Sequence, residues 1–86
     1  MDRYFISETE FGKTAIAILP TKDQVLQLFV GIDGSRSIQV HPFSHATFLV
    51  ETGVSGLKPF LKEEIISLFT KDCSAILPAF LEGLVF

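Results

Sequence analysis

The clearest alternation of apolar and polar residues runs from Gln24 to His41. It predicts two extended segments joined by Asp33-Gly34-Ser35, because an Asp-Gly pair between apolar runs is a strong hairpin signal. Every second side chain of the first segment is apolar, and this set is expected to face the core: Leu26, Leu28, Val30 and Ile32. The other set is mixed, so its face is expected to be only partly covered: Val25, Gln27, Phe29 and Gly31.

The second segment of this hairpin alternates more simply. Ile38 and Val40 are separated by polar residues, which predicts a strand with one wet face, as antiparallel sheets often have. The connection before it is either a direct two-residue Asp33-Gly34 turn or a longer loop through Ser35 and Arg36. The pattern leaves both open.

Two further strands are expected before the hairpin. Residues Arg3 to Glu8 form the first, and Lys13 to Leu19 form the second after a turn at residues 9–12. In the second strand, Ile16 and Ile18 should face one side, and Ala15, Ala17 and Leu19 the other. Two alanines on one face leave room for a bulky element, most simply a helix. The Pro20-Thr21-Lys22-Asp23 run then ends the strand as a turn.

The region after the hairpin is read as a bend followed by a fifth strand. Residues 41–45 are expected to bend because Pro42 donates no ladder hydrogen bond. Ala46 to Glu51 alternates with a period of two and is rich in β-branched and aromatic residues, which favours a strand. A helix starting near Ser44 is the alternative.

Helices are expected at the end of the chain. After the loop 52–58, Pro59 suits the first residue of a helix that runs to about Thr70. The predicted apolar stripe of that helix is Leu57, Leu61, Ile65, Leu68 and Phe69. A second, shorter helix is expected to end near Gly83, with Pro78 either starting or kinking it.

Strands followed by helices predict an α+β fold. The chain is expected to be a single domain, residues 1–86, with a four- or five-stranded antiparallel meander sheet over about residues 3–51. Two C-terminal helices, over about residues 59–83, are expected to pack on one face of that sheet.

Phenylalanine changes the picture of the surface. The 86 residues include nine Phe, one Tyr and no Trp, and a chain this short buries a smaller fraction of its surface than a larger domain does. Phe48, Phe69 and Phe80 are expected in the core. The surplus predicts an exposed patch, and exposed apolar patches indicate association. The candidate interface residues are Phe11, Phe29, Phe43, Leu84, Val85 and Phe86.

Charge and cysteine content exclude several function classes. The net charge is −3 and the basic residues are scattered, so no nucleic-acid partner is expected. No apolar run approaches the length of a membrane span, and the N-terminus does not resemble a signal peptide. Cys73 is the single cysteine, so no internal disulfide exists, which fits a reducing compartment. A cytoplasmic protein without a membrane partner is expected.

Two groups of residues are candidates for chemistry. His41 and His45 are the only histidines; a bend could bring them together, and a third metal ligand would have to come from Glu51 or Asp33. Solvated turn histidines are the simpler interpretation, so neither a metal nor a catalytic residue is predicted.

The second group precedes the predicted first helix. Gly53, Ser55, Gly56 and Lys58 could bind an anion at a helix start, although the phosphate-loop signature is missing. A plain connecting loop is the simpler interpretation of these residues.

These observations favour a non-catalytic protein-interaction module without a cofactor. It would either self-associate, most simply as a homodimer, or act as a regulator or inhibitor of a larger protein, with an open sheet edge as one means of contact. The first alternative is a small-molecule or anion-binding domain that uses the Gly53–Lys58 loop. The second is a minimal enzyme that uses His41 or His45.

Overall fold

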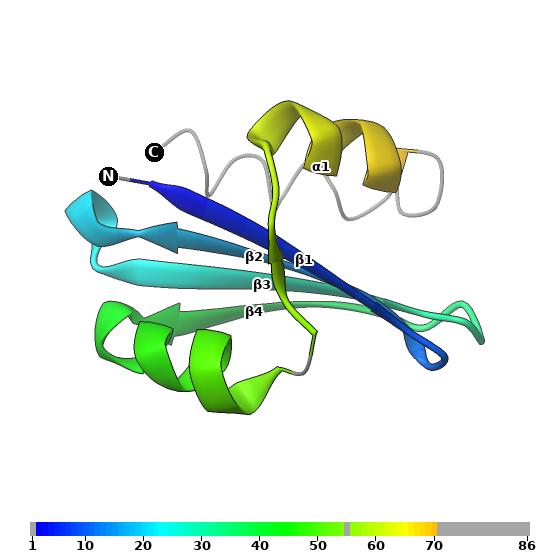
Figure 1. Ribbon diagram of the computed structural model, residues 1–86, viewed down its shortest axis with the longest axis horizontal. Coiled ribbons are helices and arrows are strands. Elements are labelled where there is room, and N and C mark those ends of the chain that lie inside the picture. The colour runs from blue at the N-terminus through cyan, green and yellow to red at the C-terminus, as the bar shows by residue number, and fades with distance from the viewer. Residues whose placement is uncertain (1, 55, 71–86) are drawn as a thin grey trace.

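The computed structural model describes residues 2–54 and 56–70 and shows an α+β fold (Figure 1). A five-stranded antiparallel sheet has the order β4-β3-β2-β1-β5, so the first four strands form the predicted meander. In chain order the elements are β1 (Arg3–Thr9), β2 (Gly12–Leu19), the 3₁₀ turn η1 (Pro20–Lys22), β3 (Gln24–Gly31), β4 (Arg36–Pro42), the 3₁₀ turn η2 (Phe43–His45), the π-helical η3 (Phe48–Gly53), β5 (Lys58–Pro59) and α1 (Lys62–Thr70).

The β3–β4 connection is the longer of the two predicted loops. The Gly31 N–H donates to the Ser35 carbonyl at 2.7 Å, and the Ser35 N–H donates to the Asp33 carboxylate at 2.9 Å. Gly34 takes a left-handed φ of 89°, which suits glycine. Ile32 therefore lies in the loop and is 77% exposed, so its predicted place in the core is wrong.

Helix α1 covers one face of the sheet, and the two alanines of β2 make room for it as predicted. Ala15 and Ala17 are fully buried beneath Ile65 and Phe69 of the helix. The same cluster includes Leu19 of β2, Ile6 of β1, and Leu26 and Leu28 of β3. Small residues in the central strand thus allow a helix to approach the backbone closely.

A second helical layer covers the opposite face, and it corrects the prediction of a strand over Ala46–Glu51. Residues 46–53 are helical, following η2, so the alternative of a helix near Ser44 is the right one. Leu49 is buried against the other set of strand residues: Phe5, Ile16, Ile18 and Val25. Ala46 and Val50 pack beside it, at helical spacing. Both faces of the sheet are apolar around residues 15–19 of β2, so both need a covering layer.

The chain passes from one face to the other around the β1 edge of the sheet (Figure 1). Leu57 still packs on the face of η3, whereas Phe60 packs on the face of α1. Between them β5 pairs with β1, and the Phe60 N–H donates to the Tyr4 carbonyl at 2.9 Å. Helix α1 therefore starts at Lys62 rather than Pro59.

The predicted apolar stripe of this helix shortens accordingly to Ile65, Leu68 and Phe69, because Leu57 lies on the opposite face and Leu61 is exposed. The predicted second C-terminal helix, with Phe80 and Pro78, lies outside the described residues. β4 also runs on through His41 and Pro42, which were expected in a bend.

Phe48 and Phe69 were both predicted to be core residues, but only Phe69 is buried. Phe69 has no exposed surface, whereas Phe48 is 63% exposed. We expect Phe69→Ala to lower the free energy of unfolding by about 3–5 kcal/mol, because it leaves a cavity under α1. Phe48→Ala is the matched control and should change it by no more than about 0.5 kcal/mol. Urea unfolding followed by circular dichroism measures both, and equal losses would contradict the core described above.

Candidate functional site: the outer edge of β4

The hydrogen bonds at the two ends of the β3–β4 ladder fix which way each residue of β4 points. The Gly31 N–H donates to the Ser35 carbonyl, and at the other end the Phe43 N–H donates to the Asp23 carbonyl at 3.2 Å. Both pairs lie in the register of the β3–β4 ladder. In an antiparallel ladder, hydrogen-bonded and non-hydrogen-bonded pairs alternate. It follows that the inward-bonding residues of β4 are Ser37, Gln39 and His41.

The remaining residues of β4 direct their backbone groups away from the sheet. Arg36, Ile38 and Val40 each present an N–H and a carbonyl at the outer edge, and Pro42 presents a carbonyl alone. In the sheet order β4 is a terminal strand, so within the described part of the chain no strand pairs with this edge. Because the N–H missing from Pro42 would point outward, proline costs the ladder nothing there, which explains why the strand continues through it.

The opposite edge of the sheet is partly covered by β5. β5 pairs with Phe5 and Ile6 of β1, and the bond from Phe60 to Tyr4 puts Pro59 at a position without a ladder hydrogen bond. A very short strand carrying proline and lysine is a usual way to block an edge. β5 thus covers part of the β1 edge, whereas within residues 2–54 and 56–70 no strand pairs with the outer edge of the seven-residue β4.

The side chains of β4 differ between its two faces. On the α1 side, Ile38 is half-buried, whereas Val40 is 59% exposed. On the other side lie the polar residues Ser37, Gln39 and His41, and the His41 Nε2 is 3.1 Å from the Gln27 Oε1. Ile38 and Val40 thus form a narrow apolar strip beside a polar one. A strand that paired with β4 would meet this pattern.

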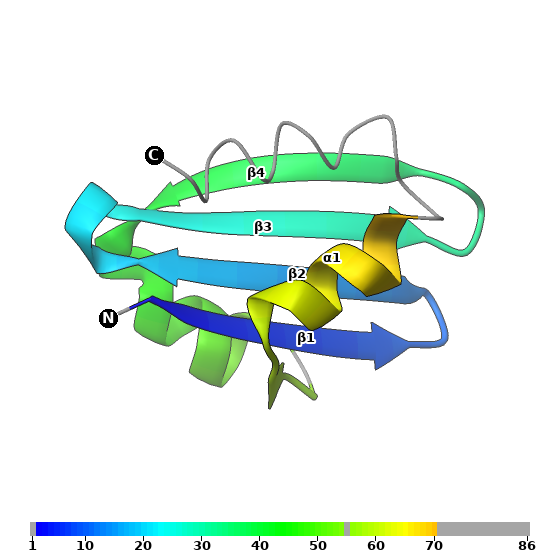
Figure 2. The ribbon, with the colours of Figure 1, turned by 90° about the horizontal axis from the view of Figure 1, so that it is seen from above.

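The outer margin of β4 is sterically clear of the second helical layer. Seen from the α1 side, β4 lies at one margin of the sheet, and residues 46–53 run beneath the sheet on the side of β1 and β2 (Figure 2). The contacts agree, since Leu49 packs on β1, β2 and the start of β3. The helix that follows β4 therefore turns away from the open edge.

The two histidines come together, but neither Asp33 nor Glu51 joins them as a third metal ligand. The bend at η2 brings the ring centroids of His41 and His45 to 6.2 Å, with the rings tilted by 43°. Asp33 lies in the loop at the other end of β4. Within residues 2–54 and 56–70, no three His, Cys, Asp or Glu side chains gather where they could hold a metal ion.

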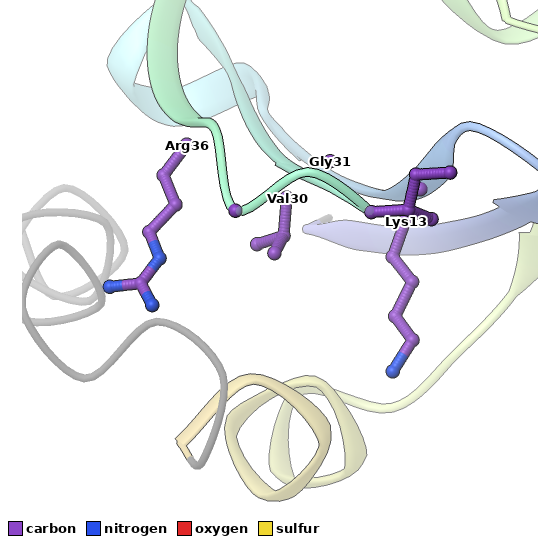
Figure 3. Close-up of a pocket in the computed structure, with 7 residues that line it drawn as sticks. Lys13, Val30, Gly31 and Arg36 are labelled. Carbon is purple, nitrogen blue, oxygen red and sulfur yellow. The ribbon is translucent and has the colours of Figure 1, made fainter.

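A cationic hollow lies at the loop end of the same strand. Lys13, Val30 and Arg36 are direct cross-strand neighbours on β2, β3 and β4. Figure 3 shows the side chains of Lys13 and Arg36 leaving the sheet on the same side, with Val30 between them. Together with Gly12, Gly31, Ile32 and Gly34 they line a hollow of about 340 Å³. Glu8 lies across from Lys13 in the register of β1 and β2, so part of the positive charge is balanced.

Hydrogen bonding inside the adjoining loop accounts for the charge state of Asp33. The hydroxyl and backbone N–H of Ser35 donate to the carboxylate and hold its pKa below the ordinary range. On the same face, near the opposite edge of the sheet, burial and the nearby Asp2 carboxylate raise the pKa of the Tyr4 phenol. Tyr4 lines a hollow of about 510 Å³ between β1 and the start of α1, together with Phe60 and Leu61.

The predicted anion loop is not at the start of α1. Lys58 belongs to β5, and residues 60–61 separate that strand from the helix. Gly53 ends η3, Gly56 has a left-handed φ of 74°, and Ser55 lies outside the described residues. The first turn of α1 carries Glu63 and Glu64, which disfavour an anion at that helix end. Anion binding by this loop stays a prediction.

The predicted interface residues fall at opposite ends of the sheet. Phe11 is 69% exposed in the β1–β2 turn, beside Ile32, whose N–H donates to the Phe11 carbonyl at 3.0 Å. Phe43 is exposed in η2, after the end of β4, and Phe29 is half-buried on β3. Leu84, Val85 and Phe86 lie outside the described residues. Aromatic content alone did not single out β4, whose signal is the polar–apolar alternation from Ser37 to His41.

Comparison with known protein families, with curated proteins and with solved structures found no match. Among the described residues, no helix has the length and apolar character needed to cross a bilayer.

Proposed function

We propose that this chain is a small, non-catalytic protein-interaction module that binds an extended segment of another chain along the open edge of β4. The observation that carries the proposal is the outward row of backbone donors and acceptors at Arg36, Ile38 and Val40. Strand addition to a sheet edge draws its affinity from main-chain hydrogen bonds and its specificity from alternate side chains. A regulator or inhibitor of a larger protein could act in this way.

The side chains of β4 specify what the added strand should carry. Its residues on the α1 side lie beside Ile38 and Val40 and should be apolar. A residue beside Arg36 should be acidic, because cross-strand pairs of opposite charge stabilise a sheet. On the other face, polar residues suit Ser37, Gln39 and His41. The expected ligand is therefore an extended segment of alternating apolar and polar residues with an acid near one end.

Proline substitutions separate the outer edge of β4 from its inner edge. Val40→Pro removes an outward N–H and should leave the fold intact, because no bond to β3 is lost. Peptides selected from a random displayed library by the wild-type chain should show the alternating pattern and should fail to bind this variant. Binding is measured by fluorescence polarisation, and stability by thermal unfolding.

Gln39→Pro is the matched control, one residue away. It removes an inward N–H from the β3–β4 ladder and should lower the melting temperature clearly, whereas Val40→Pro should not when both are compared at a concentration where the wild type is monomeric. Selected peptides without alternation, or peptides that bind Val40→Pro as well as the wild type, would contradict binding at this edge.

A second candidate function is anion binding, and the cationic hollow favours it. Lys13 and Arg36 stand on either side of Val30, with their strands about 9–10 Å apart, a span that fits a phosphate or carboxylate group between the two charged ends. If this hollow binds an anion, inorganic phosphate should shift the backbone amide resonances of residues 30–36, and Arg36→Gln should weaken binding by about tenfold or more.

Lys58→Gln is the control that tells the two possible anion sites apart. It should leave phosphate binding unchanged if the anion occupies the hollow beside Arg36. A loss of binding with Lys58→Gln and none with Arg36→Gln would place the anion in the Gly53–Lys58 loop instead. If the chemical-shift changes do not saturate at any phosphate concentration, this second candidate function is removed.

A further inference from the structure

We propose that one partner of the β4 edge is a second copy of this chain, paired antiparallel through β4 about a two-fold axis at Gln39. This inference rests on the proposed function, because it needs the same open edge. It adds the identity of the partner, the symmetry and the register. The two sheets would join into one continuous antiparallel sheet, with the α1 layers of both copies on the same side.

The register follows from the direction of the backbone groups. A two-fold axis perpendicular to an antiparallel pair places one residue opposite its own copy, and paired residues then lie at equal distances on either side of it. The groups available for bonding belong to Arg36, Ile38, Val40 and Pro42. Two outward residues therefore have to meet in each hydrogen-bonded pair.

An axis at Gln39 satisfies this condition over the whole strand. Ile38 then exchanges two hydrogen bonds with Val40 of the second copy, and Val40 does the same with the other Ile38. The Arg36 N–H donates to the carbonyl of Pro42 at each end. Proline has no N–H to return, so the missing donor falls at the last pair of the ladder, where it costs least.

The side chains match in this register. On the α1 side, Ile38 and Val40 of one copy lie beside Val40 and Ile38 of the other, which covers the apolar strip. On the opposite face, Ser37 meets His41 and Gln39 meets itself, so polar groups face polar groups. The arginines stand at opposite ends of the ladder, each beside a proline, which avoids a like-charge pair.

Axes at Ile38 and at Val40 give competing registers that also pair outward residues with each other. With the axis at Ile38, Arg36 would face Val40, and His41 and Pro42 would lie beyond the paired region. With the axis at Val40, Ile38 would face Pro42, and Arg36 and Ser37 would be left unpaired, so both registers use less of the seven-residue strand. The axis at Gln39 is favoured because every residue of β4 then has a partner.

The register is tested by cysteine cross-linking in full-length chain carrying Cys73→Ser. Gln39→Cys should form a disulfide-linked dimer under mild oxidation, because opposed residues in a non-hydrogen-bonded pair have their Cβ atoms close enough for that bond. Ser37→Cys is the matched control. It lies opposite His41 of the second copy, about 13 Å along the strand from its own copy, and should stay monomeric on a reducing-agent-free gel.

The association itself is tested by light scattering after size exclusion. The wild type should elute with twice the 9.5 kDa mass of one chain. Val40→Lys should return it to a single-chain mass with unchanged circular dichroism, because a lysine would replace an apolar contact in both copies. Val40→Thr is the conservative control and should stay dimeric.

Each outcome decides a different point. A wild-type chain that stays monomeric over the accessible concentration range, while selected peptides bind the β4 edge, would overturn the second copy as partner and leave the interaction function in place. A dimer that Val40→Lys does not dissociate, or one that cross-links through position 37 rather than 39, would overturn the proposed interface. Failure of both the peptides and the dimer would remove the function together with this inference.

Discussion

An antiparallel ladder engages only every second residue of a strand in each direction, and this alternation decides what the surface of the molecule offers. In β4 the inward direction is taken by Ser37, Gln39 and His41, so the outward direction belongs to Arg36, Ile38 and Val40. The same alternation places Pro42 and Pro59 where their missing donors cost no bond within the sheet. One edge is partly covered by a two-residue strand, whereas no strand of the described residues pairs with the other.

The second constraint is that the sheet is apolar on both faces at one end. β2 alternates alanine and isoleucine, so α1 can lie close on the alanine side while residues 46–53 cover the isoleucine side. A chain with this arrangement has to cross from one face to the other. It does so around β1, by way of β5, and in crossing it pairs with Phe5 and Ile6 on that edge. Covering both faces and pairing with part of one edge are thus achieved by the same segment.

Much of this architecture could be predicted from the sequence, because strand periodicity is a local property. The β2 alternation identified the face that receives a helix, and the turn residues located the hairpins. The prediction of a strand over Ala46–Glu51 was wrong because these six residues fit two patterns. Ala46, Phe48 and Val50 alternate as in a strand, but Ala46, Leu49 and Val50 are spaced as in a helix, and the helix is what forms. The need to cover a second apolar face settles the choice, and a short window does not contain that information.

Pro59 shows a different limit. The sequence correctly identified a position where a missing N–H is harmless, but both the first turn of a helix and an unpaired strand position meet that condition. The sequence also suggested open edges of the sheet, but it did not say which strand would form one. An open edge was expected, whereas the order β4-β3-β2-β1-β5, which makes β4 that edge, depends on contacts between segments far apart in the chain.

Amide hydrogen exchange, followed by NMR over a series of protein concentrations, tests the central claim most directly. At high dilution the amides of Gln39 and His41 should be protected and those of Ile38 and Val40 should exchange freely. Raising the concentration, or adding a selected peptide, should protect Ile38 and Val40 and leave Gln39 and His41 as they were. Protection of Ile38 and Val40 at every dilution, without any partner, would show that the chain itself covers this edge and would contradict the account.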